Sequence, residues 1–169
     1  WNAAWQDAGY YSLAQLSVAR GDWEEALYEI DKSLVRNWHN LRGRHLKATI
    51  LRHLGRKEDA LSLIEESLRM DRFNFGCGFE KFLLTGNDAD WQTLVSLMRP
   101  EAHNYEELAL DYASAGCWEE ALDVVDKVIC MNVLGQTMLH YYKSWFLICL
   151  DRKEEALAAI REAERQTPD

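Results

Sequence analysis

One heptad occurs four times in this chain with small changes. It reads GDWEEAL at 21–27, GRKEDAL at 55–61, GCWEEAL at 116–122 and DRKEEAL at 151–157. Glycine tolerates the left-handed backbone that commonly ends a helix, and paired acids suit the first turn of the helix that follows. Each heptad therefore predicts a junction between two helices, with Asp151 replacing the glycine in the last one.

The spacing of the heptads sets the repeat length. Their alanines are Ala26, Ala60, Ala121 and Ala156, which are 34, 61 and 35 residues apart. A period of 34 residues, with Ile or Val four residues after each alanine, resembles the tetratricopeptide repeat (TPR) family. The resemblance implies an all-α, TPR-like α-solenoid in which helix–turn–helix hairpins stack into a curved right-handed array. Most units lack the terminal proline of the family pattern, and none has its first-helix glycine.

The interval of 61 residues equals one period plus 27, which predicts a shortened, degenerate hairpin in the middle. We expect brief helices over about 78–85 and 88–98, with Asn87 or Asp88 capping the second. GCG at 76–78 is interpreted as a break before the first of them.

The chain is then a single array, and its start at Trp1 indicates a fragment of a longer protein. Its five units are about 7–40, 41–74, 75–101, 102–135 and 136–169.

Residue types that perform catalysis or bind metals do not converge in the sequence. The five histidines form no HExxH pair, and the four cysteines form no CxxC pair. Phosphate-binding glycine loops and the GxSxG elbow are absent as well. Paired acids such as Glu24–Glu25 lie at helix starts, where they solubilise the array. We therefore expect no enzyme activity, no metal and no cofactor.

Charge, hydropathy and cysteine usage restrict the function further. A net charge of −9 argues against a nucleic-acid binder, which must neutralise phosphates with clustered Lys and Arg. No segment reaches the roughly 18 apolar residues of a membrane helix, so no membrane partner is expected. Scattered cysteines in a chain of this size favour reduced thiols and hence a cytoplasmic location.

In TPR proteins the first helix of each hairpin lines the concave face. Carried onto this sequence, the resemblance places partner-binding residues at fixed repeat positions of those helices. The Lys/Asn/Arg clamp of chaperone-tail binders is absent from the corresponding positions. The ten candidates are Tyr11, Gln15, Arg42, His45, Thr49, Arg52, His53, Glu106, Tyr141 and Trp145.

Charges are segregated along the chain. Residues 41–57 hold six Arg or Lys and no acid, whereas residues 105–126 hold seven Asp or Glu and no base. Two interpretations stay open at this point. The blocks can recognise a dipolar or acidic partner, or they can pair with neighbouring helices through ordinary surface contacts.

The sequence therefore predicts a non-catalytic scaffold that binds a peptide or protein on its concave face, with an acidic partner suggested by the basic block. An alternative comes from a second resemblance. WNAAWQDAGYYSLAQ at 1–15 and RNWHNLRGRHLKATILRHLG at 36–55 resemble the repeat segment of large bacterial proteins that join a TPR array to a sugar-mutarotase-like β-sandwich. That resemblance implies an intramolecular docking arm of a carbohydrate-related protein, whose partner is a domain of the same parent chain.

Overall fold

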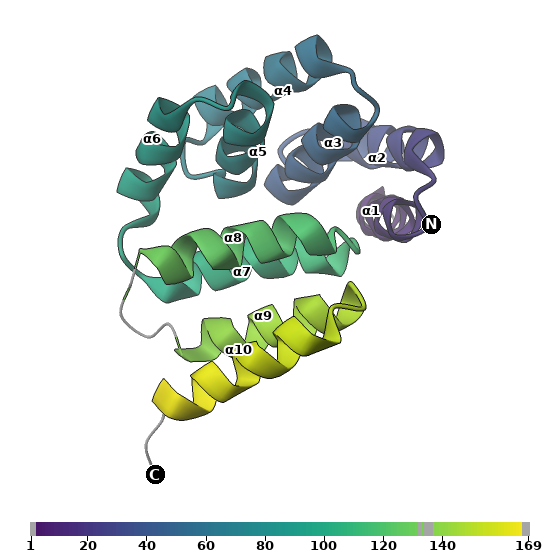
Figure 1. The fold of residues 1–169 in the computed structure, drawn as a ribbon. Coiled ribbons are helices and arrows are strands. Elements are labelled where there is room, and N and C mark those ends of the chain that lie inside the picture. The colour runs from purple at the N-terminus through teal and green to yellow at the C-terminus, as the bar shows by residue number, and fades with distance from the viewer. Residues whose placement is uncertain (1–2, 132, 134–136, 167–169) are drawn as a thin grey trace. The chain divides into compact units, whose positions relative to one another are not determined.

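The computed structural model describes residues 3–131, 133 and 137–166, so that Trp1 lies outside the described residues. Within this part of the chain it contains ten α-helices and no strand (Figure 1). The predicted all-α repeat fold is confirmed. The helices are α1 (Ala3–Ala19), α2 (Trp23–Arg36), α3 (Leu41–His53), α4 (Lys57–Met70), α5 (Phe75–Thr85), α6 (Asp88–Met98), α7 (Ala102–Ser114), α8 (Trp118–Cys130), α9 (Thr137–Cys149) and α10 (Lys153–Gln166).

The four repeated heptads end four helices in the same way. At the first, the Gly21 amide donates to the Val18 carbonyl and the Asp22 amide to the Ser17 carbonyl, both at 2.9 Å. This pair of hydrogen bonds is a Schellman motif, and it recurs at the other three heptads. The predicted left-handed conformations are present, with φ of 80° at Gly21, 71° at Gly55, 77° at Gly116 and 57° at Asp151.

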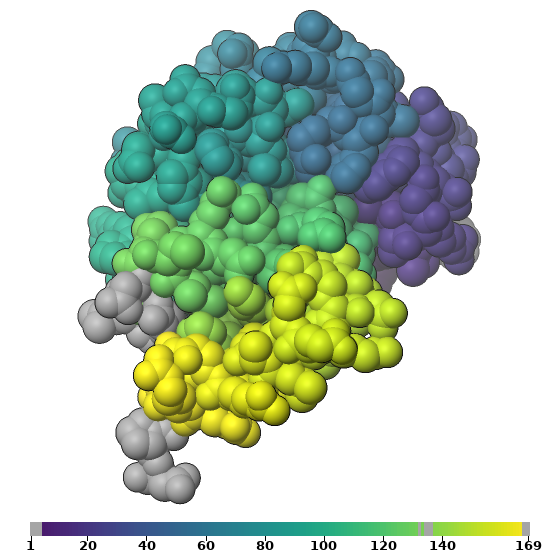
Figure 2. Space-filling view, in the orientation of Figure 1, coloured from purple at the N-terminus to yellow at the C-terminus, as the bar shows by residue number. Residues whose placement is uncertain are grey.

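The chain forms two compact units, residues 1–97 and 98–169, each described here by itself. Within them, α1/α2, α3/α4, α7/α8 and α9/α10 pack as hairpins (Figure 1). All four heptad alanines are buried, because each lies where two helices touch. Side chains fill the spaces that the ribbons leave within each unit (Figure 2). The assignment of all five hairpins to one continuous array stays a prediction.

Successive hairpins stack in the same register in both units. Asp31 on α2 pairs with Lys47 on α3 at 2.7 Å, and Asp126 on α8 pairs with Lys143 on α9 at 2.6 Å. The two ion pairs occupy equivalent repeat positions. Stacking of this kind buries the apolar face that one hairpin cannot bury alone.

The shortened middle hairpin, α5 and α6, corrects one sequence interpretation. GCG at 76–78 lies inside α5, so the expected break is wrong. Asn74 accepts a hydrogen bond from the Cys77 amide at 3.2 Å, and this cap starts the helix at Phe75. A side chain at position 76 would clash with the His45 ring, so the glycine there serves close packing of α5 on α3.

The second half of the middle hairpin matches its prediction. Helix α6 runs from Asp88 to Met98, and Asn87 caps it by accepting a hydrogen bond from the Ala89 amide at 3.0 Å. Aromatic side chains join the two helices, since the Trp91 ring lies 6.1 Å from that of Phe79 and 5.6 Å from that of Phe82. Large aromatic contacts hold this hairpin together despite its short helices.

Candidate functional site

The basic block of residues 41–57 is largely neutralised within the first unit. The Arg44 side chain is fully buried, donates to Ser67 at 2.7 Å and to Glu66 at 2.9 Å, and lies 4.3 Å from the centre of the Trp38 ring. Lys47 pairs with Asp31 as described above. Most of this block therefore holds helices together.

Arg52, one of the ten candidates, belongs to the same packing network. Its guanidinium donates to the Glu80 carboxylate at 2.7 and 3.2 Å, and the Thr49 hydroxyl donates to the same carboxylate at 2.9 Å. Glu80 is fully buried, so its charge requires such partners. The three side chains tie α3 to α5.

The other candidates on α3 divide into buried and exposed residues. His45 and Thr49 are buried, so neither offers an accessible surface in this unit. His53 is exposed, and its ring stacks on that of Trp23 at 4.0 Å between centroids. Arg42 is exposed near the start of the helix. On α1, Tyr11 and Gln15 are half-buried neighbours, with the Gln15 amide donating to the Tyr11 hydroxyl at 3.5 Å.

The second unit exposes an apolar stripe along α9, which consists of Met138, Tyr141, Trp145 and Ile148. These residues follow one another at intervals of three and four, which places them on one helix face. Each is between 40% and 55% exposed. The Trp145 ring packs against the rings of Trp118 and Phe146, at centroid distances of 5.7 and 5.3 Å. These contacts fix the orientation of the ring, while part of it stays exposed to solvent.

Glu106 occupies the repeat position of Tyr141 on the preceding first helix, α7. It is partly exposed and lies 3.7 Å from the ring of His103, which also approaches Glu107 at 3.5 Å. The remainder of the acidic block makes several cation contacts, among them Asp126 with Lys143 and Asp123 with Lys127. The second unit nevertheless keeps an excess of acids, with fourteen Asp or Glu against seven Lys or Arg.

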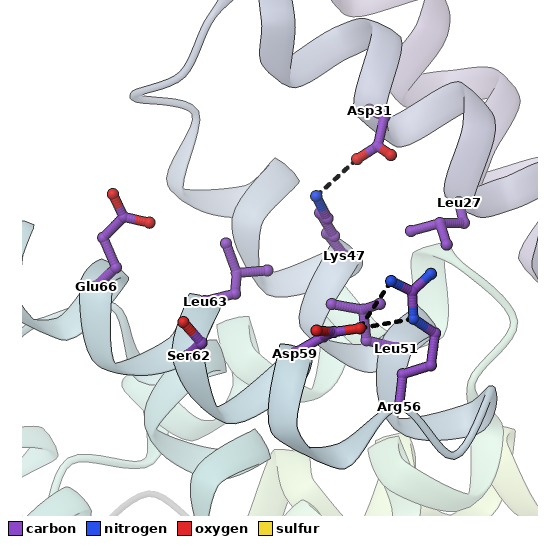
Figure 3. Close-up of a pocket in the computed structure, with 9 residues that line it drawn as sticks. All are labelled: Leu27, Asp31, Lys47, Leu51, Arg56, Asp59, Ser62, Leu63 and Glu66. Atoms are coloured by element: carbon purple, nitrogen blue, oxygen red, sulfur yellow. Dashed lines mark hydrogen bonds and ion pairs between the residues drawn. The ribbon is translucent and has the colours of Figure 1, made fainter.

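A pocket of about 280 Å³ opens between α2 and α4 (Figure 3). Two ion pairs lie along its lining, each at 2.7 Å: Lys47 on α3 with Asp31 on α2, and Arg56 with Asp59, both at the start of α4. Because these charges satisfy one another, the pocket presents no concentrated charge to a ligand. Its lining residues are Leu27, Asp31, Lys47, Leu51, Arg56, Asp59, Ser62, Leu63 and Glu66.

Burial accounts for the shifted pKa values of two side chains in the described part of the chain. Burial raises the pKa of the Cys77 thiol to about 12, which keeps it protonated and unreactive near neutral pH. Burial lowers the pKa of His140, which lies 3.2 Å from the Gln166 amide. Among the described residues, no group of three or more His, Cys, Asp or Glu is placed to hold a metal ion, and no helix is long and apolar enough to cross a membrane.

Comparison with known proteins supports the fold. No family model matches the sequence, and a search of curated proteins returned no match. Among solved structures, residues 41 to the end of MamA from Desulfovibrio magneticus RS-1 align with a TM-score of 0.53 at 16% identity, covering 97% of this chain and 98% of that one. A double mutant described as MamA RS-1 ArsTM gives 0.53 at 16% identity, covering 95% and 96%.

A kinesin light chain from Podosopora anserina, described as having nearly identical TPR-like repeats, aligns with a TM-score of 0.45 at 14% identity and covers 94% of this chain and 92% of that one. The alignment with MamA supports an all-α helical-repeat fold. At these identities the similarity establishes the fold alone. The resemblance to mutarotase-linked repeat segments stays a prediction.

Proposed function

We propose that this chain is a non-catalytic scaffold that binds a peptide or protein segment on the concave face formed by the first helices of its hairpins. The observation that carries the proposal is the apolar stripe of α9. Contiguous exposed apolar side chains on soluble proteins commonly mark interaction sites, and aromatic residues are frequent anchors there. Tyr141 and Trp145 are the predicted candidates that suit this role best.

The charge of the second unit supports a particular partner chemistry. Its net charge of −7, from fourteen acids and seven bases, supplies most of the −9 of the chain. A negative surface attracts cationic segments over a Debye length of about 8 Å at physiological salt. We therefore expect a segment in which apolar anchors are flanked by Lys or Arg.

The basic block supports an acidic partner less strongly than its composition suggests. Four of its six cations are paired with acids: Arg44, Lys47, Arg52 and Arg56. The cations of this block that an acidic partner would meet at the surface include Arg42 and Lys57, which are both exposed. An acidic partner is therefore a separate proposal for the first unit, with its own charge-reversal test.

Peptide display against immobilised residues 1–169 tests the proposal. Met138→Glu with Ile148→Glu places two carboxylates on the α9 stripe, at side chains that are half exposed and tolerate the change. Leu157→Glu on α10 is the matched control, because that leucine is equally exposed outside the stripe. We expect selected peptides to combine apolar and basic residues and to lose at least about tenfold in affinity for the double variant alone.

Three results would contradict parts of this proposal. If peptides bind the double variant with the same affinity as the unchanged chain, the α9 stripe is not the binding site. Acidic peptides whose binding disappears on Arg42→Glu with Lys57→Glu would move the site to the first unit. Measurable turnover by the purified chain would contradict the non-catalytic part.

The stripe suits a domain of the same parent protein equally well as a partner. In that case the chain is the intramolecular docking arm of a carbohydrate-related bacterial protein. Hydrogen exchange of the full-length protein separates the two functions, since docking within one chain would protect α9 without added partner. A cytoplasmic location is part of the proposal and is supported by four free cysteines, two buried and two exposed.

A further inference from the structure

Two loops of the first unit have the same structure: residues 37–40 between α2 and α3, and residues 71–74 between α4 and α5. Each is a β-turn, in which the backbone amide of the closing asparagine donates to the carbonyl of the first residue at 3.1 Å. These hydrogen bonds fix the two central residues of each turn on the surface. The exposed central residues are Trp38, His39, Arg72 and Phe73.

The two turns lie next to each other. The Asn74 side chain donates to the Leu41 carbonyl at 3.2 Å, which joins the second turn to the start of α3. Arg44 joins the first turn to α4, because its guanidinium lies 4.3 Å from the centre of the Trp38 ring and donates to Ser67. The side chains of both turns therefore belong to one edge of the first unit.

Four large apolar side chains are exposed at this edge. The exposed fraction is 82% for Val35, 44% for Trp38, 37% for Met70 and 51% for Phe73. Each turn has a helical hairpin before it and another after it, and these hairpins leave the four side chains uncovered within the unit. The edge is therefore an apolar surface in the interior of the repeat, and exposed groups of this kind commonly mark interaction sites.

The charge of this edge is opposite to that of the whole chain. Residues 35–42 and 69–75 hold four arginines and one acid, Asp71, whereas the chain carries a net charge of −9. The Asp71 carboxylate accepts a hydrogen bond from the backbone amide two residues later at 2.8 Å. Arg69 and Arg72 are exposed, and neither forms an ion pair with any described residue. The turn edge, as we name this surface, consists of Val35, Trp38, Arg69, Met70, Arg72 and Phe73.

The neutral polar side chains of the two turns hold the turns themselves. Asn40 accepts a hydrogen bond from the backbone amide three residues later at 2.9 Å, and Asn74 does the same at 3.2 Å. Asn37 donates to Asp7 at 2.9 Å. The polar groups that the edge offers to a ligand are therefore mainly guanidinium groups, which bind carboxylates through paired hydrogen bonds. A carboxylate ligand suits the edge better than a neutral sugar does.

We propose that the turn edge binds an acidic segment of a partner protein that carries an apolar side chain between its carboxylates. The apolar side chain lies against the rings of Trp38 and Phe73, and the carboxylates pair with Arg69 and Arg72. Tryptophan and arginine are common anchors of protein interfaces, and turns that are fixed before binding lose little entropy in the complex. None of the ten concave-face candidates belongs to this edge. Its preference for acids is opposite to that of the α9 stripe, so the two surfaces select different partners.

Peptide display against immobilised residues 1–169 carrying Met138→Glu with Ile148→Glu tests the proposal, because these substitutions remove the α9 stripe as a binding surface. We expect selected peptides to combine Asp or Glu with an aromatic or aliphatic residue. Fluorescence anisotropy then gives their affinities for further variants. Arg69→Glu with Arg72→Glu should weaken binding at least about tenfold, and Phe73→Ala, at a half-exposed side chain, should weaken it severalfold without a change in the circular dichroism spectrum.

Arg20→Glu with Lys57→Glu is the matched control. It makes the same change of charge at two exposed side chains near the opposite ends of α2 and α4, about 20 Å from the turn edge. We expect it to leave the affinity within about twofold of the unchanged chain, because charges so far apart are screened by salt.

The proposal would be overturned if the selected peptides were not acidic, or if acidic peptides bound the Arg69→Glu and Arg72→Glu double variant as tightly as the unchanged chain. An equal loss in the control would overturn it too, since net charge alone would then govern binding. Titration with maltohexaose covers the remaining occupant, and binding of this sugar that Phe73→Ala abolishes would assign the edge to carbohydrate. Acidic peptides should bind the chain equally with and without the α9 substitutions, so this proposal and the proposed function fail independently.

Discussion

The ion pair between Arg52 and Glu80 allows one stability prediction to be worked out in detail. Arg52→Ala leaves the fully buried Glu80 carboxylate without the two guanidinium hydrogen bonds at 2.7 and 3.2 Å. Removing one partner of a buried pair costs about 3–5 kcal/mol. The Thr49 hydroxyl still donates to this carboxylate, and the Arg52 side chain is one-fifth exposed, so we expect the lower end, about 3 kcal/mol.

Urea unfolding followed by circular dichroism measures this loss. With a slope of about 2 kcal/mol per molar urea, the transition of the first unit should shift down by about 1.5 M. Arg56→Ala is the control, because its 2.7 Å pair with Asp59 is exposed and contributes about 0.5 kcal/mol. Arg52→Met combined with Glu80→Met should recover most of the stability, since it leaves no unpaired buried charge.

Equal effects of Arg52→Ala and Arg56→Ala would refute this reasoning. The carboxylate of Glu80 would then not depend on Arg52, and the basic block would again be available as a binding surface. The reasoning would also be refuted if Arg52→Met combined with Glu80→Met were less stable than each of the two single variants. The loss of stability would then not come from an unpaired buried charge.

Four further predictions concern the repeat geometry and one histidine. Ala121→Leu should destabilise the second unit by about 1–3 kcal/mol, measured by thermal unfolding, because the alanine is fully buried between helices; a neutral result would contradict the register. Gly76→Ala should lower the unfolding temperature through its clash with His45, whereas Gly9→Ala, which meets nothing, should raise stability by up to about 1 kcal/mol. Asp151→Gly should stabilise by about 1 kcal/mol in urea, because φ of 57° strains a residue with a Cβ; a loss would contradict it. Burial holds the pKa of His140 below 6.5, so stability should fall as pH drops from 6.5 towards that lowered value; His140→Gln should flatten this pH dependence, and an unchanged slope would show that another group titrates.

The repeat could be predicted from the sequence because its signals are local. A heptad with a glycine, paired acids and an alanine specifies a helix end and the next helix start, and its period gives the hairpin. The capping amide of Asn87 is equally local. These features do not depend on contacts between distant residues, and the helices that they delimit form where they were expected.

Other features could not be predicted because they depend on contacts between distant residues. GCG at 76–78 looks like a helix breaker locally, but Gly76 is required by the His45 ring some 30 residues earlier. The cations of the basic block find acids on other helices, as Arg52 finds Glu80. The signal that was present is Glu80 itself, a lone acid within an apolar stretch of α5, which requires a buried cation nearby.

Hydrogen exchange of residues 1–169, with and without a display-selected peptide, tests the central claim most directly. The account predicts that the peptide slows exchange in α9, over residues 137–149, and that Met138→Glu with Ile148→Glu abolishes the effect. Protection confined to α3 of the first unit, with α9 unchanged, would contradict the claim that this scaffold binds its partner through the apolar stripe.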